Sequence, residues 1–161
     1  MHLISDNITN DFSVEVNLVG NNIDPERITE ILGLEPVKSG RTGEPRNNGR
    51  GEAVHEQGFW TYEISSNDEI NECRDHQLLC LAEKLEPHAE ALRAAGVERF
   101  YFYFTLSSFV GLLNIRFKAE TLATLARLNA DLYVSCFDCF NPRHEIWNGT
   151  ELAASPDKDG N

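Results

Sequence analysis

Two stretches of this sequence alternate strictly between apolar side chains and side chains that carry polar groups. In the first stretch the apolar positions are Phe12, Val14, Val16 and Leu18. In the second, phenylalanines at positions 100, 102 and 104 are separated by Tyr101 and Tyr103. An alternation of period two is typical of a β-strand with one buried face. The chain is therefore constrained to a fold in which a sheet buries one face in a core and keeps polar groups on the other.

Between these stretches the pattern becomes helical. Asp24 supplies a capping carboxylate, Pro25 stands at the first helical position, and Gly33 closes the short helix that they begin. A longer helix is predicted to follow a turn at residues 65–68, to be interrupted at Pro87 and to end at Gly96. Its buried side consists of Ile70, Leu78, Leu81, Leu85 and Leu92. A last helix is predicted over residues 120–129.

Three further strands are predicted, at residues 59–64, 113–117 and 131–137, which gives the element order β-α-β-α-β-β-α-β. Segments 14–36 and 113–134 share one strand-helix-turn plan, as in ferredoxin-like folds. We therefore predict an α+β fold, a mostly antiparallel sheet of about five strands with helices on one face. The single domain is predicted to span residues 12–147, between an N-terminal extension at residues 1–11 and a polar tail at residues 148–161.

The charge balance limits the partners of the chain. Fourteen Lys and Arg residues against 26 Asp and Glu residues give a net charge of −12. This charge repels nucleic acid and anionic lipid and attracts basic proteins. The longest apolar run is far shorter than the roughly 20 residues of a membrane-spanning helix, and residues 1–11 lack the pattern of an export signal. We expect a cytoplasmic protein with reduced thiols and no membrane contact.

Several short motifs resemble a known family. DPERIT at residues 24–29 and LGLEP at residues 32–36 are followed by Arg41, Gly43 and Glu44 and by Gly58-Phe59-Trp60. This series, with the stretch from Glu120 to Leu132, is similar to the bacterial domain of unknown function 4279 family. The resemblance implies a small bacterial cytosolic α+β domain without an established activity, so it carries over no catalytic residue. By analogy with other small acidic domains, an immunity-like role against a toxin is one expectation.

Residues 38–58 show no hydrophobic period and are predicted to form a long loop. The candidate binding residues in it are Arg41, Arg46, Arg50 and His55. Guanidinium groups bind phosphates and carboxylates, and the glycines of this segment let backbone N–H groups approach an anion. The alternative is a solvated loop whose arginines pair with acidic side chains of the protein's own surface.

Four aromatic residues are candidates for a partner-binding patch: Trp60, Tyr62, Tyr101 and Tyr103. Aromatic side chains are enriched at the centres of protein interfaces. The four form one patch if they share the face of the sheet that no helix covers. The alternative is a second small core beneath the 38–58 segment.

The cysteines and histidines were considered as metal ligands or catalytic groups. Cys73, His76 and Cys80 would lie along one flank of a helix, and Cys136 and Cys139 form a C-x-x-C pair. A structural zinc site needs a fourth ligand, residues three apart lie on opposite faces of a regular strand, and no histidine lies in a nucleophile motif. We therefore predict no metal, no cofactor and no catalytic residue, and interpret Cys73 and Cys80 as small, partly buried thiols at the flank of the helix.

Two functions remain from this reasoning. The first is a non-enzymatic protein-binding module, immunity-like or regulatory, that uses the open sheet face, the acidic surface and the basic segment 38–58 to hold a protein partner, in the favoured case a basic one. The same sheet face is also a candidate homodimer interface. The alternative is a domain or enzyme that binds a small anion or phosphate ligand through the Arg-rich segment 38–58.

Overall fold

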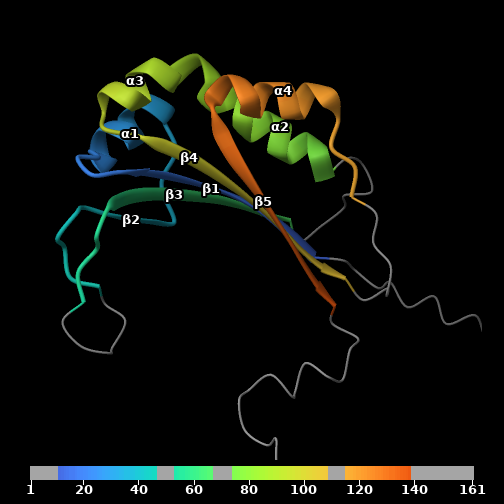
Figure 1. The fold of residues 1–161 in the computed structure, drawn as a ribbon, viewed down its shortest axis with the longest axis horizontal. Helices are drawn as coiled ribbons and strands as arrows, with labels where there is room; N and C mark the ends of the chain where they lie inside the picture. Colours follow the sequence, from blue (N-terminus) through green and yellow to red (C-terminus); the bar gives the residue numbers. More distant parts are fainter. Residues whose placement is uncertain (1–10, 47–52, 67–73, 109–114, 139–161) are drawn as a thin grey trace, which may run out of the picture.

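The computed structural model describes residues 11–46, 53–66, 74–108 and 115–138, in which one mixed sheet lies beneath a layer of helices (Figure 1). The strand order across the sheet is β2-β3-β1-β4-β5. The strands are β1 (Asp11–Gly20), β2 (Lys38–Gly40), β3 (Gly58–Ser66), β4 (Arg99–Ser108) and β5 (Ala130–Asp138). The helices are α1 (Pro25–Leu32), α2 (Arg74–Leu85), the 3-10 turn η1 (Glu86–His88), α3 (Ala89–Ala94) and α4 (Ala119–Leu128). The predicted α+β class is confirmed.

The sheet is mostly antiparallel, as predicted, with one parallel pair at its edge. The central strand β1 is antiparallel to both of its neighbours, β3 and β4. β2 extends the sheet beyond β3, also antiparallel, whereas β5 runs parallel to β4. Parallel neighbours need a crossover connection, which α4 provides. β4, α4 and β5 thus form a βαβ unit.

The order of elements along the chain differs from the predicted one, and a ferredoxin-like order is not confirmed. β2 and β3 both follow α1, and residues 115–118 are not in a strand, although a strand was predicted over residues 113–117. Residues 113 and 114 lie outside the described ranges. Ile115 and Phe117 alternate with polar residues because they pack, partly buried, against the core from an irregular segment. Two alternating positions do not distinguish such a segment from a strand.

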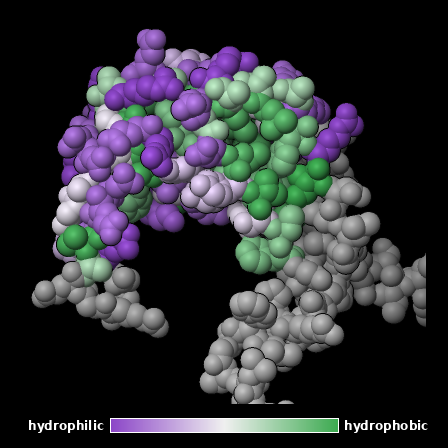
Figure 2. All heavy atoms as spheres, in the orientation of Figure 1, coloured by the Kyte–Doolittle hydropathy of each residue, from purple (hydrophilic) through white to green (hydrophobic). Residues whose placement is uncertain are grey.

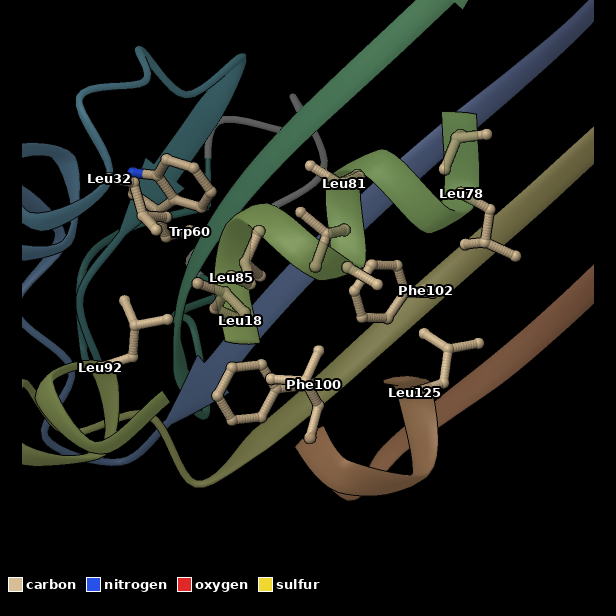
Figure 3. Packing of buried hydrophobic residues seen from close by; sticks show 14 of the residues in the cluster. Leu18, Leu32, Trp60, Leu78, Leu81, Leu85, Leu92, Phe100, Phe102 and Leu125 are labelled. Carbon is tan, nitrogen blue, oxygen red and sulfur yellow. The ribbon is translucent and has the colours of Figure 1, made fainter. Parts of the chain in front are cut away.

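The alternating residues of β1 and β4 form the centre of the core. Val14, Val16, Phe102 and Phe104 are completely buried. They face the helices, and Figure 3 shows leucines of α2 lying over the phenylalanines of β4. Burial of one such side chain contributes about 1.5–3 kcal/mol. Because this packing is on one side of the sheet, the helices gather there, and in the described part of the chain no helix covers the opposite face (Figure 1).

The predicted helix boundaries are confirmed where their signal is local. The Asp24 side chain accepts a hydrogen bond from the N–H of Arg27 at 3.3 Å, and Gly33 ends α1 with a φ of 61°. Pro87 lies in η1, which separates α2 from α3, and Gly96 follows α3 with a φ of 93°. Each of these signals acts through the geometry of its own backbone, so it needs no information about distant residues.

The prediction of a long irregular loop at residues 38–58 is wrong in the described parts. The segment begins with β2, and its backbone then folds back on itself. The N–H of Gly43 donates to the carbonyl of His55 at 2.8 Å, and Pro45 forms an antiparallel bridge with Val54. Main-chain pairing of this kind needs no hydrophobic period when neither face is buried, so pattern analysis does not detect it.

Some predictions fall on residues outside the described ranges. They concern the N-terminal extension apart from residue 11, the polar tail, Arg50, Cys73 and Cys139. These stay predictions. In the described part of the chain, no helix has the length and apolar character needed to cross a membrane.

Candidate functional site

The sheet face that is turned away from the helices carries a cluster of tyrosines. Tyr101 and Tyr103 alternate with the buried phenylalanines of β4, and Tyr133 lies beside Tyr103 on β5. The rings of Tyr103 and Tyr133 are stacked, with centroids 5.0 Å apart, and the Tyr101 ring is tilted against Tyr133 at 6.0 Å. Tyr133 is 49% exposed, and the other two are half-buried. We call this cluster, with its neighbours Glu15, Asn17 and Asp131, the tyrosine face.

The register of the sheet places carboxylates beside these rings. One row across the strands contains Glu63, Glu15, Tyr103 and Tyr133. The next row contains Thr61, Asn17, Tyr101 and Asp131. Directly paired positions on neighbouring strands are about 5 Å apart. Glu15 therefore borders Tyr103 on one side, and Asp131 borders Tyr101 on the other.

The tyrosine face contains both hydrogen-bond donors and acceptors. Partial burial, followed by the neighbouring Tyr133, Glu15 and Tyr101, raises the pKa of the Tyr103 hydroxyl, which stays protonated and able to donate. The Arg99 guanidinium donates to the Tyr101 hydroxyl at 3.0 Å, and this bond is the main cause of the raised pKa of Arg99. The face thus presents phenol hydroxyls as donors next to carboxylates that only accept.

Trp60 and Tyr62 do not belong to this cluster. Trp60 is completely buried and lies beside Leu32 of α1 (Figure 3). Its Nε1–H donates to Thr29 Oγ1 at 3.0 Å. Tyr62 is stacked against Trp60 and packs on the same core. Residues two apart share one face of a strand, so both point toward the helices, while Tyr101 and Tyr103 point away from them. The predicted four-residue patch is therefore wrong, as is the alternative of a second core, because Trp60 belongs to the main one.

Arg41 is turned toward the first turn of α1. Its guanidinium lies 3.5 Å from Asp24 Oδ1 and forms an ion pair with Glu26. Its backbone N–H donates to Glu44 Oε2 at 2.8 Å. The positive helix N-terminus, which otherwise suits an anionic ligand, is thus occupied by carboxylates of the chain, and these engage the arginine. This is the pairing that the solvated-loop alternative predicted for Arg41.

The other candidates of the anion site are only partly described. The N–H of Arg46 donates to the carbonyl of Ala53 at 2.7 Å, and the His55 ring lies 4.8 Å from the ring of Phe59. Arg50 lies outside the described ranges. Arg41 thus forms ion pairs with carboxylates of the chain, and the His55 ring contacts the Phe59 ring.

A cavity of about 320 Å³ lies at the margin of the tyrosine face. It opens where β4 and β5 begin and α4 ends, and its polar wall groups come from Glu98, Arg99, Asn129 and Asp131. The C-terminal end of a helix carries partial negative charge. Two carboxylates add to this negative charge, but cations already lie beside them. Tyr101 chiefly, and then Asp131 and Glu98, raise the pKa of Arg99. Arg93 donates to the Leu128 carbonyl at the end of α4.

Comparison with protein families places this sheet and its helices in one family. Residues 10–137 match the family described as domain of unknown function (DUF4279). The chain belongs to this family. Searches among curated proteins and among solved structures gave no match. The family assignment confirms the sequence resemblance, and the matched range of the DUF4279 domain includes every residue of the tyrosine face.

Glu15, Asp131 and Tyr133 are residues of this DUF4279 candidate site that the sequence analysis did not select. Tyr133 alternates with Leu132 and Val134, which indicates a position on the face away from the core. Its contact with Tyr103, however, depends on the parallel register of β4 and β5. Local alternation identifies the face of a strand but not its neighbour, so this signal was incomplete.

The cysteine and histidine candidates of the DUF4279 domain form one close pair. Cys80 Sγ lies 3.4 Å from His76 Nε2 on α2. Cys80 is exposed, so the interpretation of a partly buried thiol is wrong for it, and Cys136 on β5 is exposed as well. Within the described ranges, no three metal-binding side chains are gathered at one point.

Proposed function

We propose that the chain is a non-enzymatic protein-binding module and that the tyrosine face is its binding surface. One observation carries the proposal: three tyrosines are gathered on the helix-free side of the sheet, in contact with one another. Tyrosine supplies a large rigid ring and a hydroxyl at low entropic cost, and it is enriched among the residues that dominate binding energy. Three such rings on an open sheet offer a partner an anchor.

A partner with a basic surface fits this face best. The chain has a net charge of −12, and complementary potentials speed encounter and fix orientation. Glu15 and Asp131 are acceptors for Lys or Arg side chains, and the adjacent rings can receive a cation on their faces. A second copy fits the same face less well, because carboxylates of both copies would approach one another.

The cavity beside Asp131 provides a place for one cationic side chain of that partner. Its wall combines the Asp131 and Glu98 carboxylates with the carbonyl end of α4. Arg99, which also lines it, donates to the Tyr101 hydroxyl. The Arg99 guanidinium is itself a cation in this wall, so a lysine or arginine that enters the cavity meets two carboxylates and one positive charge.

This chemistry supports the proposal of an immunity-like or regulatory role. An acidic domain that covers the basic surface of another protein blocks that surface for anionic substrates such as nucleic acid. Binding alone achieves this, and no catalytic group is required. The alternative of a small-anion site in segment 38–58 has weaker support, because Asp24 and Glu26 already engage Arg41.

The test is to purify the tagged full-length chain from the cells that produce it, to identify the protein that is retained with it, and to measure the affinity between the two. We expect Tyr103→Ser and Tyr133→Ser each to weaken binding of the retained protein by about 10-fold to 100-fold, the effect of losing an interface anchor. The control is Val37→Ser, which changes an apolar side chain of similar exposure, 58%, away from the tyrosine face. It is expected to bind as the unchanged chain does.

Circular dichroism and Tm establish that each variant is folded before its affinity is compared. Retention of the partner at equal affinity by both tyrosine variants would overturn the proposed surface. An acidic partner would overturn the proposed role of charge.

A further inference from the structure

The edge strand β5 offers a second surface. It carries Asp131 and Tyr133 of the tyrosine face, but its outer backbone edge is separate from that face. β5 pairs with β4 without interruption from Phe100↔Ala130 to Ser108↔Asp138, and no described segment pairs with its outer side. The outer side of an edge strand presents a row of backbone N–H and C=O groups, and proteins block such rows with charged side chains, especially lysine, with proline or with a bulge. The sequence of β5, ADLYVSCFD, contains neither lysine nor proline, its register has no bulge, and its two charged residues, Asp131 and Asp138, lie at or near its ends.

Apolar side chains are concentrated along the same edge. Of the large apolar side chains that are exposed in the described ranges, four of six lie on β5 or on α4, which packs on it: Leu122, Tyr133, Val134 and Phe137, each 44–49% exposed. Figure 2 shows hydrophobic residues gathered on the side of the molecule that α4 and β5 form. A long, unblocked and apolar edge is a template for pairing with another strand.

We propose that β5 pairs in antiparallel orientation with β5 of a second copy, across a two-fold axis at Val134. In this register Val134 meets Val134 of the second copy, and Leu132 meets its Cys136. A two-fold axis perpendicular to the sheet keeps the helices of both copies on one side and gives one continuous sheet. The Val134 contact lies on the axis and is formed once, and the contact of Leu132 with Cys136 is formed twice, once from each copy.

The occupant is a second copy because the strand is complementary to itself. Tyr133 lies opposite Ser135 of the second copy, and Asp131 lies opposite its Phe137. No carboxylate of β5 therefore faces another across the axis, and like charges directly opposite one another are what would destabilise such a pair. The arrangement also joins the two tyrosine faces side by side, although it does not depend on what they bind.

The first experiment measures the mass of the full-length chain by light scattering and sedimentation between about 5 and 200 µM, because the dimer fraction depends on protomer concentration. We expect a dimer that dissociates on dilution. Val134→Lys places two ammonium groups opposite each other at the axis and is expected to give a monomer throughout. Val37→Lys is the matched control, with the same substitution at an exposed position beside β2, and is expected to dimerise normally.

The second experiment tests the register by cross-linking. In a chain whose own cysteines are replaced by serine, Val134→Cys is expected to form a disulfide-linked dimer on mild oxidation. Ser135→Cys is expected not to, because its equivalent on the second copy lies two positions along the strand, beyond the roughly 7 Å reach of a disulfide between Cα atoms.

A chain that is monomeric at the highest concentration overturns the proposal, and so does a Val134→Lys variant that dimerises like the unchanged chain. Capture of a different protein at β5 by a monomeric chain would assign the edge to that protein instead. These outcomes are separate from those of the proposed function, because Tyr103 lies on β4, and Tyr103→Ser is expected to keep the mass of the unchanged chain while it weakens partner binding.

Discussion

At the scale of single residues, the tightest backbone packing lies where α3 leads into β4. A Cβ atom on Gly96 would lie 2.2 Å from the carbonyl oxygen of Asn22, and one on Gly20 would lie 2.0 Å from the carbonyl oxygen of Gly96. Gly96 also has a φ of 93°, which side-chain-bearing residues adopt only with strain. Gly33 has a positive φ as well, but a Cβ there would meet nothing within 4 Å. Gly96 is thus restricted by both conformation and space, and Gly33 by conformation alone.

This difference gives a stability prediction. Gly33→Ala is expected to lower the free energy of unfolding by about 1–2 kcal/mol, the cost of a left-handed alanine. Gly96→Ala is expected to lower it by about 3–4 kcal/mol, because strain and a backbone clash combine. Urea unfolding of both variants with unchanged m-values is the measurement. Equal losses in the two variants would show that the close approach to Asn22 has no energetic effect.

The residues that sequence analysis placed correctly are those whose signals are local. Asp24, Gly33 and Pro87 act on their own backbone, so their roles are readable from a few neighbouring letters. Trp60 is different. Its strand shows which residues share a face, but the choice between core and open face depends on the partner strand β1, which is distant in the sequence.

At the scale of elements, α1 is tied to the rest of the molecule at several points. Asp24 caps it, Trp60 on β3 donates to Thr29 within it, and Arg41, just beyond β2, forms an ion pair with Glu26 in its first turn. The short helix therefore does not rely on its own propensity, which is marginal for eight residues. The ion pair also orients the hairpin that follows β2.

The cap makes stability depend on pH. The hydrogen bond from the N–H of Arg27, with smaller contributions from Glu26 and Arg41, lowers the pKa of Asp24 below its ordinary value of 3.8. Because the folded-state pKa is the lower one, the stabilising contribution is complete above the unfolded pKa and is lost as pH falls through the folded pKa. Asp24→Asn keeps a capping side chain without the charge. We expect the Tm difference between the unchanged chain and this variant to shrink as pH falls below about 4.

Thermal unfolding followed by circular dichroism from neutral pH to about pH 2 measures this difference. The Glu86 carboxylate, whose pKa is lowered chiefly by its hydrogen bond from Arg127, titrates in both chains. Its effect therefore cancels in the comparison. A Tm difference of constant size across the whole range would contradict the role assigned to the Asp24 charge.

The features that sequence analysis missed are β2, the backbone pairing after it, and the parallel pairing of β4 with β5. The first two are held by main-chain hydrogen bonds, and the third is set by the crossover through α4. None of these pairings is marked by a hydrophobic period in the sequence. The predicted strand at residues 113–117 shows the converse, since Ile115 and Phe117 alternate without belonging to a strand in the described part.

At the scale of the whole molecule, charge acts on the two proposed interfaces in opposite directions. Salt screens the attraction between the acidic chain and a basic partner, which weakens their binding. Salt also screens the repulsion between two chains of net charge −12, which favours the dimer. Raising NaCl from about 50 to 500 mM is therefore expected to loosen partner binding and to tighten the β5 dimer. Calorimetry and sedimentation at each salt concentration measure the two effects, and a shift of both in the same direction would contradict one assignment.

The fold class and the existence of an open sheet face followed from the sequence, because both depend on the alternation in β1 and β4. The composition of the candidate site did not. It needs Glu15, Tyr103 and Tyr133 from three strands, and their meeting depends on the order of the strands in the sheet. No pairing of distant strands is written in a single local pattern.

In a sheet that is covered by helices on one side, the strand residues divide into two sets with different constraints. Every second residue of the inner strands maintains the interior, and the residues between them are released from that task. Substitutions at the released positions can redirect recognition toward new targets and still leave the scaffold intact. Relatives built on this plan are therefore free to diverge in what they recognise faster than in how they fold.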